Sequence, residues 1–172
     1  MFKPDAQFEK ITDIDISFLK SKNIKSVILD LDNTLIDLDG NCLEGLKDWM
    51  DNAKQNGIKF CIATNSINGE KTKRISELLD IPFVHKSFKP SKIGIKKALK
   101  ILKTDPKNTA EIGDQVFTDV WVSNRTKMFS ILTQPIAEDR LKIDKIKRKM
   151  EKLVLRIWEF GDGEEFSEKE RK

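Results

Sequence analysis

The sequence has few cysteines and no long apolar segment, and each scarcity excludes a class of protein. Its two cysteines, Cys42 and Cys61, are not spaced as a metal-binding pair, so we expect free thiols in a reducing cytoplasm. No stretch approaches the roughly 18 consecutive apolar residues that a membrane-spanning helix needs. Residues 1–5 contain no apolar signal core, so we expect no secretion signal.

A large excess of one charge is also lacking. The 32 basic and 28 acidic residues leave a net charge of +4, which does not by itself indicate a nucleic-acid partner. The 172 residues are enough for one domain with a real core, and we find neither an internal repeat nor a low-complexity linker. We therefore predict a single domain over residues 1–160 and a disordered tail at 161–172, where Phe166 is the one apolar residue.

Short apolar runs alternate with segments of helical periodicity. This alternation indicates an α/β fold with a parallel sheet and right-handed crossovers. The lead-in, residues 1–24, predicts a short helix capped by Asp13. The apolar runs predict five strands, at about 25–31, 58–63, 83–84, 109–112 and 129–132. The helices between them carry the apolar stripes Leu43, Leu46, Met50 and Ala53, then Ile75, Leu78 and Leu79, then Ile95, Ala98, Leu99 and Leu102.

Polar side chains follow the carboxyl ends of these strands. Asp30 and Asp32 come one residue apart after the first strand, so the alternation of an extended chain points both the same way. Taken singly, each residue has an ordinary interpretation as a turn, a helix cap or a surface lysine. Their ordered placement favours one shared crevice, because the carboxyl ends of a doubly wound sheet converge. The further members of the set are Thr64, Asn65, Lys89, Asp114 and Asp119.

Carboxylates, a hydroxyl at a helix start and a lysine are the inventory for phosphoryl transfer with a hard divalent cation. One carboxylate can act as a covalent nucleophile, and a second can protonate the leaving oxygen and later deprotonate water. Mg²⁺ prefers oxygen ligands, and it would relieve the repulsion between Asp30 and Asp114. A hydroxyl and free N–H groups at a helix start receive phosphate oxygens, and a lysine neutralises the charge of the phosphoryl group.

Four segments resemble the four motifs of haloacid-dehalogenase-superfamily phosphatases. They read Asp-Leu-Asp-Asn-Thr-Leu at 30–35, Thr-Asn-Ser at 64–66, Lys-Pro at 89–90 and Gly-Asp-Gln-Val-Phe-Thr-Asp at 113–119. More narrowly, the chain is similar to the YqeG-like group of subfamily IIIA, the relatives of phosphatidylglycerophosphate phosphatase, over roughly residues 2–157. The resemblance implies a three-layer Rossmann-like fold and a phosphatase that works through an aspartyl-phosphate.

The resemblance also implies roles for the residues at the strand ends. Asp30 would be the nucleophile and Asp32 the general acid and base. The carboxylates of Asp30 and Asp114, with the backbone carbonyl of Asp32, would hold Mg²⁺. Thr64 and the amide of Asn65 would bind the phosphoryl group.

Two further residues take supporting roles under the same resemblance. Lys89 would stabilise both the nucleophile and the bound phosphate. Asp119 would orient Lys89 or a metal-bound water.

The intervals between the motifs are too short for a cap domain. In this superfamily the caps that select a substrate follow the first motif or lie between the second and third. Here residues 33–63 hold one loop, one helix and one strand, and residues 66–88 hold one helix and a short strand. We therefore predict a capless, open site, which suits a large substrate better than a small metabolite sealed away from water.

A basic helix is predicted near the C-terminus, at about 140–158. It could dock on the sheet with a solvated basic face, rest on anionic lipid, or contact nucleic acid, although no RNA-binding motif is evident. Among its basic residues, the acids Asp144 and Glu151 interrupt the charge. The basic residues are Lys142, Lys145, Lys147, Arg148, Lys149, Lys152 and Arg156.

The sequence thus leads us to expect a Mg²⁺-dependent phosphomonoester hydrolase. The resemblance makes phosphatidylglycerophosphate the first choice of substrate, at the inner face of a membrane with peripheral contact through the basic helix. Two alternatives stay open. One is a phosphatase of a soluble ester such as a sugar phosphate or nucleotide, and the other is a regulatory or ribosome-associated binding protein with weak phosphatase activity. The oligomeric state does not follow from the sequence.

Overall fold

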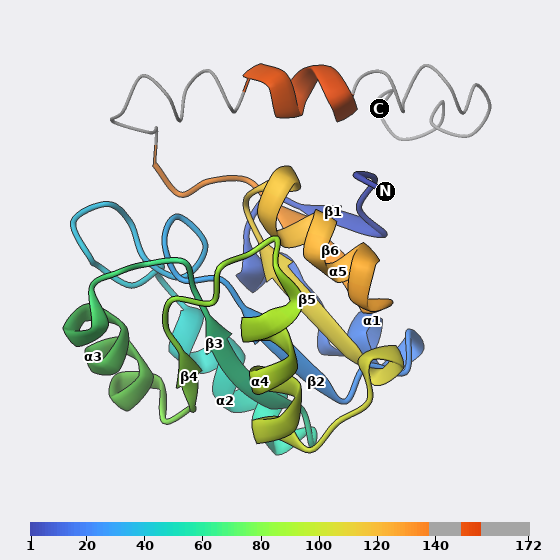
Figure 1. Ribbon diagram of the computed structural model, residues 1–172. Coiled ribbons are helices and arrows are strands. Elements are labelled where there is room, and N and C mark those ends of the chain that lie inside the picture. Colours follow the sequence, from blue (N-terminus) through green and yellow to red (C-terminus); the bar gives the residue numbers. More distant parts are fainter. Residues whose placement is uncertain (138–148, 156–172) are drawn as a thin grey trace, which may run out of the picture.

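A six-stranded parallel sheet forms the centre of the protein, as seen in a computed structural model that describes residues 1–137 and 149–155 (Figure 1). The strand order is β1-β6-β5-β2-β3-β4, and every neighbouring pair is parallel. The α/β prediction is therefore confirmed. The strands are β1 (Ala6–Phe8), β2 (Ser26–Leu29), β3 (Lys59–Ala63), β4 (Phe83–Val84), β5 (Thr109–Gly113) and β6 (Phe129–Thr133).

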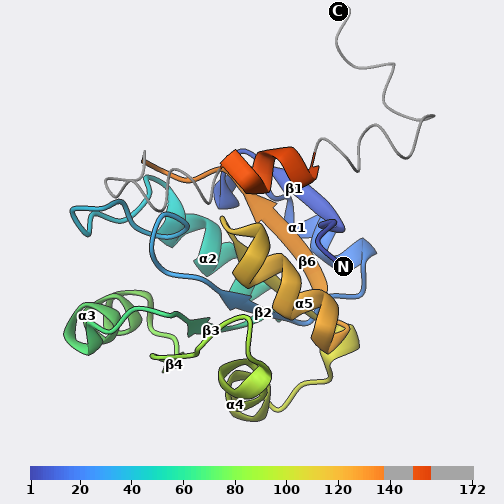
Figure 2. The ribbon, with the colours of Figure 1, turned by 45° about the horizontal axis from the view of Figure 1, so that its top comes forward.

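Helices cover both faces of this sheet (Figure 2). One buried cluster joins the sheet to α1 (Ile16–Ser21), α2 (Leu46–Gln55) and α3 (Gly69–Leu79). A second cluster joins the opposite face to α4 (Lys92–Leu102) and α5 (Trp121–Thr126). Three short turns complete the fold, namely η1 (Ile11–Asp13), η2 (Pro106–Asn108) and the π-helical η3 (Val116–Val120).

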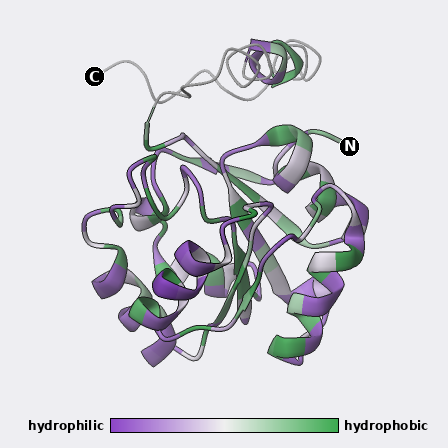
Figure 3. Cartoon of the chain, turned by 60° about the vertical axis from the view of Figure 1, so that its left-hand side comes forward, coloured by the Kyte–Doolittle hydropathy of each residue, from purple (hydrophilic) through white to green (hydrophobic). Residues whose placement is uncertain are grey.

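The strand that carries the acidic pair is the most enclosed part of the fold. All four residues of β2 are buried, as expected for a central parallel strand with helices on both faces. The hydropathy colouring of Figure 3 shows apolar strands inside and hydrophilic outer faces on the helices. Because the chain runs outward from β2 to β4 and then returns to β5, the topological switch point lies between β2 and β5. Ligands bind at such a point in open α/β sheets.

Two local predictions were wrong. The lead-in contains the edge strand β1 beside β6, and its helix α1 follows Asp15, whereas Asp13 closes the preceding turn by accepting a hydrogen bond from the Lys10 amide. Leu78 was assigned to the buried stripe of α3, but its side chain is 53% exposed. In its place the polar residues Thr72 and Ser76 are buried on that helix.

The described part of the C-terminal region is one short helix, residues 149–155, at the carboxyl end of the sheet (Figure 1). Glu151 is buried there and accepts a hydrogen bond from the Phe117 amide at 3.2 Å, while Leu155 packs against Val116 and Val120. The rest of the predicted helix at 140–158 and the predicted tail at 161–172 lie outside the described residues. Within residues 1–137 and 149–155, no helix has the length and apolar character to cross a membrane.

Candidate active site

Strands β2 and β5 bring two acidic segments together at the switch point. The Asp30 amide donates to the Ile112 carbonyl at 2.9 Å, which extends the β2–β5 ladder to the first residue after β2. Asp114 directly follows β5, and its carboxylate accepts a hydrogen bond from the Thr34 hydroxyl at 3.4 Å. The side chains of Asp30 and Asp114 are both buried. The pairing of β2 with β5 thus brings two side chains that are 84 positions apart in the sequence to the carboxyl end of the sheet.

Asp119 reaches the same place from the turn after β5. Carboxylate oxygens of Asp30, Asp114 and Asp119 lie within 4.8 Å of one another. Gly113 makes this approach possible, because a Cβ atom there would lie 2.3 Å from the Asp119 carboxyl carbon. The Asp119 carboxylate is held by the Gln115 amide, which donates to it at 3.0 Å.

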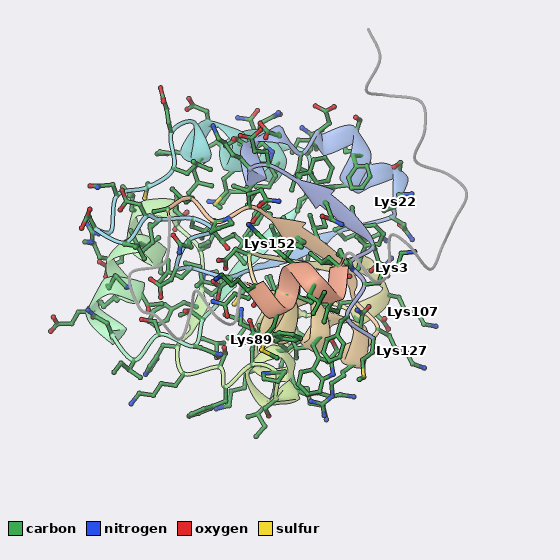
Figure 4. The ribbon with its side chains drawn as sticks, turned by 90° about the horizontal axis from the view of Figure 1, so that it is seen from above. Lys3, Lys22, Lys89, Lys107, Lys127 and Lys152 are labelled. Atoms are coloured by element: carbon green, nitrogen blue, oxygen red, sulfur yellow. The ribbon has the colours of Figure 1, made fainter. Side chains whose placement is uncertain are left out.

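Lys89 contacts two of these carboxylates and one further acid. Its Nζ lies 2.9 Å from Asp30 Oδ1, 2.7 Å from Asp119 Oδ1 and 3.3 Å from Glu111 Oε1. The lysine side chain is 1% exposed, so its charge depends on these partners rather than on water. Figure 4, seen from above, places Lys89 within the fold, whereas Lys3, Lys22, Lys107 and Lys127 lie along one side of the molecule.

Burial and crowding perturb the acids of this cluster. Burial raises the pKa of Asp30 to about 6; Lys89 opposes the rise, and Asp119 adds to it. Burial likewise raises the pKa of Glu111 to about 8, again against the effect of Lys89. For Lys89, burial lowers the pKa, but Asp119, Asp30 and Glu111 together raise it well above its usual value, so the lysine stays charged.

Glu111 is a member of the cluster that the sequence reasoning missed. It lies inside β5, is 1% exposed, and accepts a hydrogen bond from the Ser123 hydroxyl at 3.0 Å. A signal was available, since a charged residue between Ala110 and Ile112 in a predicted buried strand requires a partner. The sequence alone does not identify that partner as Lys89.

The second motif supports the lysine from the side. The Asn65 carboxamide donates to the Lys89 carbonyl at 2.8 Å and accepts from the Lys89 amide at 2.7 Å. Thr64 is buried at the end of β3, and its hydroxyl accepts a hydrogen bond from the Ser66 amide at 3.0 Å. The side chain of Asn65 therefore fixes the Lys89 segment. The sequence predicted phosphate binding for Asn65 but not this second role.

Asp32 occupies a different environment from Asp30. Its carboxylate forms an ion pair with Lys71 of α3, and the two side chains remain 39% and 28% exposed. Lys71 also lines a hollow of about 320 Å³ between the loop after β2 and the start of α3. The two aspartates thus separate into a buried group beside Lys89 and a group that solvent can reach. Lys71 was not among the predicted site residues.

No cap domain separates the motifs within residues 1–137. The stretch between Asp32 and Thr64 holds a loop, α2 and β3, and the stretch between Asn65 and Lys89 holds α3 and β4. The described chain thus carries no cap insertion at either place, as the spacing of the motifs predicted, and the acidic cluster lies at the carboxyl end of the central strands.

Comparisons with known proteins agree with this arrangement. Residues 1–137 match a family described as mitochondrial PGP phosphatase. A Bacillus subtilis (strain 168) protein described as probable phosphatase YqeG is 36% identical over 155 residues, which cover 90% of each chain. A solved uncharacterized protein from Listeria monocytogenes serotype 4b superposes with a TM-score of 0.56 at 19% identity, covering 78% of this chain and 99% of that one. An uncharacterized protein from Corynebacterium glutamicum superposes with a TM-score of 0.53 at 15% identity, covering 83% of this chain and 99% of that one.

The two structural similarities concern the fold, while the family match and the YqeG identity concern the class of protein. This is a phosphatase of the haloacid dehalogenase superfamily, whose members generally use a divalent metal. Within that superfamily, the chain belongs to the PGP phosphatase family whose model it matches.

The donor set at the switch point fits such a metal. Asp30, Asp114 and Asp119 offer buried carboxylate oxygens, and a hard divalent cation takes oxygen ligands of this kind. Asp30 and Asp119 also pair with Lys89. A divalent cation would reduce the repulsion among acids that one lysine cannot balance.

Proposed function

We propose that this protein is a Mg²⁺-dependent phosphomonoester hydrolase that works through an aspartyl-phosphate on Asp30, and that its substrate is phosphatidylglycerophosphate. The observation that carries the chemistry is the contact of Lys89 with Asp30 at 2.9 Å beside the acidic group. The lysine favours the ionised carboxylate that a nucleophile requires, against the burial that favours the protonated form.

The reaction has two steps in this scheme. A carboxylate oxygen of Asp30 forms a bond to phosphorus, the ester P–O bond breaks, and Asp32 gives its proton to the leaving alkoxide. Asp32 then takes a proton from water, the hydroxide oxygen bonds to phosphorus, and the bond to Asp30 breaks to release inorganic phosphate. Asp32 suits the proton-transfer role because its side chain is 39% exposed and pairs with Lys71, which lines the hollow.

The remaining residues of the site bind and orient. Lys89, Thr64 and the backbone amide of Asn65 would hold the phosphoryl oxygens, and Asp119 would position Lys89. The carboxylates of Asp30 and Asp114 with the backbone carbonyl of Asp32 would hold Mg²⁺. When bound, the cation would neutralise the charge that develops on the transferred phosphoryl group.

The choice of lipid substrate is supported by the description of the matched family and by the absence of a cap insertion between the motifs in residues 1–137. Peripheral membrane contact through the basic C-terminal helix stays a prediction, because the structure describes residues 149–155 of that helix and not its remainder. Within this described part, Lys149 and Lys152 are exposed.

The test is phosphate release from phosphatidylglycerophosphate in mixed micelles with Mg²⁺, beside a panel of soluble phosphate esters. We expect Asp30→Asn to reduce turnover by at least about a thousandfold, because an amide cannot form the acyl-phosphate. Asp48→Asn, which removes an exposed acid of α2, should leave turnover unchanged. EDTA should stop the reaction, and added Mg²⁺ should restore it.

Full turnover by Asp30→Asn would contradict the aspartyl-phosphate. Preference for a soluble ester would keep the chemistry and replace the substrate. Weak turnover of every ester would favour a macromolecular substrate or a binding role.

A further inference from the structure

Three large apolar side chains are exposed beside the phosphate-binding residues. The exposed fractions are 83% for Ile67, 64% for Phe88 and 59% for Ile93. Ile67 lies two positions after Asn65, Phe88 directly precedes Lys89, and Ile93 is the second residue of α4. Large apolar side chains gathered at one site on a surface indicate an interaction, because burying them from water is favourable.

Backbone contacts hold these three residues in one structural unit. The Asn65 side chain bonds both the amide and the carbonyl of Lys89, which ties the segment of Ile67 to that of Phe88. The Ser91 amide donates to the Phe88 carbonyl at 2.7 Å, and the Gly94 amide donates to the Ser87 carbonyl at 3.3 Å. We call Ile67, Phe88 and Ile93 the apolar rim.

The segment that carries Phe88 and Ile93 is basic. Residues 86–103 contain seven lysines, of which Lys89 is buried in the active site, and no acidic residue. Lys86 is exposed and lies two positions from Phe88, and Lys92 adjoins Ile93 at the start of α4. Exposed apolar residues bordered by lysines match the two attractions that bring a protein to an anionic bilayer, apolar insertion and binding of anionic headgroups.

The rim also lies next to the places that a lipid headgroup would have to reach. Asn68, the neighbour of Ile67, lines the hollow of about 320 Å³ together with Lys71, the ion-pair partner of Asp32. Leu38 lines the same hollow from the loop after β2 and is 36% exposed. Apolar side chains therefore border the open site near both the phosphate-binding segment and the proposed proton donor.

We propose that the apolar rim inserts into the surface of an anionic lipid bilayer and so brings the active site to phosphate esters at the lipid–water boundary. This inference rests on the proposed function for the substrate it serves. It assigns the membrane contact to loops that carry the catalytic lysine, whereas the sequence reasoning had considered the C-terminal helix.

The test measures co-sedimentation of the full chain with phosphatidylcholine vesicles, with and without phosphatidylglycerol. The rim variant is Ile67→Ser/Ile93→Ser, and Phe88→Ser is a separate variant in case the pair disturbs folding. The matched control is Leu78→Ser/Ile101→Ser, which removes exposed apolar residues from the far ends of α3 and α4, where they are 53% and 46% exposed. Turnover of a soluble ester is measured for every variant.

We expect the wild type and the control to bind the anionic vesicles alike, and each rim variant to bind at least about tenfold more weakly. Soluble-ester turnover should stay unchanged in the rim variants, which separates membrane contact from chemistry. Equal vesicle binding by rim and control variants would overturn the proposal, and so would equal binding to vesicles without phosphatidylglycerol. A rim variant that converts a dimer to a monomer would instead make the rim an interface between copies of this chain.

The two proposals fail in distinguishable ways. If vesicle binding depends on the rim but no phosphate is released from phosphatidylglycerophosphate, the membrane contact is supported and the lipid substrate is rejected. If phosphate is released from that lipid but vesicle binding is the same in the rim variants, the substrate is supported and the membrane contact of the rim is rejected.

Discussion

At the scale of residues, one lysine faces three acids. Asp30, Glu111 and Asp119 surround the Lys89 ammonium in a buried site, so full ionisation of the group would leave an excess of negative charge. A proton or a cation relieves such an excess. The acid that contacts Lys89 at the longest distance, Glu111 at 3.3 Å, is also the one whose pKa rises to about 8. We therefore expect Glu111 to be the group that holds a proton near neutral pH in the metal-free protein.

This leads to a prediction for Glu111→Gln. The folded protein holds the Glu111 proton up to a pKa of about 8, whereas the unfolded chain releases it near 4.5. The folded state therefore binds more protons between these values, and the free energy of unfolding should fall as pH rises through that window. The variant lacks this contribution, so the fall between pH 5 and pH 8 should be smaller by on the order of a few kcal/mol.

Urea unfolding in EDTA at both pH values measures the effect. Glu77→Gln, which removes an exposed acid of α3, should follow the wild type. Parallel curves for the wild type and Glu111→Gln would show that Glu111 is ionised throughout.

The residues that follow strands were accessible to sequence reasoning, and the residues that act within elements were not. Asp30 and Asp114 stand out because each interrupts an apolar pattern where a strand ends. Glu111 and Lys71 sit inside regular elements, where their partners come from distant segments. Pairwise contacts of this kind depend on the three-dimensional fold, and spacing along one chain does not supply them.

At the scale of elements, the Lys89 segment is fixed by a close approach of α4. A Cβ atom on Gly94 would lie 2.4 Å from the Ser87 Cβ and 2.5 Å from the Ser87 carbonyl oxygen. No side chain fits in that space. The helix and the strand-end loop can therefore adopt their present separation only with glycine at this position.

We predict that Gly94→Ala destabilises the protein and lowers activity together. The added methyl group must separate α4 from the loop, which should cost about 1–3 kcal/mol and shift Lys89 from Asp30. Gly69→Ala is the matched control, because nothing lies within 4 Å of a Cβ atom there and alanine favours a helix. Thermal unfolding and soluble-ester turnover measure both effects. Equal stability of the two variants would show that the loop yields without cost.

Elements were predicted best where their periodicity is long. The stripe of α4 is buried as expected at Ile95, Ala98 and Leu99, because eleven helical residues offer three turns of evidence. The three-residue edge strand β1 offers no such repetition, and it was missed. Leu78 shows the opposite error, because it was assigned to the buried stripe of α3 and its side chain is exposed.

At the scale of the whole molecule, the N-terminal segment closes one side of the sheet. The Asp5 carboxylate accepts hydrogen bonds from the amide and the hydroxyl of Ser130, both at 2.8 Å, and the Asp5 amide donates to the Ser130 carbonyl at 3.0 Å. These contacts hold β1 against β6. The edge of β6 is thereby covered, and an uncovered edge strand is a site of aggregation.

Asp5→Ala should therefore reduce the free energy of unfolding by about 1–3 kcal/mol, because two hydrogen bonds to a charged acceptor are lost. Asp15→Ala, at an exposed helix cap whose side chain makes no capping bond, should change it by less than about 0.5 kcal/mol. Chemical denaturation compares the two. Unchanged stability of Asp5→Ala would mean that β1 is held by its backbone pairing alone.

The architecture as a whole was predictable because it depends on the order of elements. Alternating strands and helices between Lys25 and Thr133 indicated the parallel sheet, and the short intervals between motifs indicated an open site. The placement of β1 was not predictable in this way, since its partner β6 is the last strand among the residues that the structure describes.

The pairing of β1 with β6 has a consequence for synthesis on the ribosome. Asp5 and Ser130 are 125 positions apart, so at about 5–20 residues per second the N-terminal segment waits roughly 6–25 seconds for its partner. The acidic cluster is delayed in the same way, because Asp30 emerges long before Asp114 and Asp119. A nascent chain therefore carries unpaired backbone and an incomplete catalytic site until nearly all of the sheet has been translated.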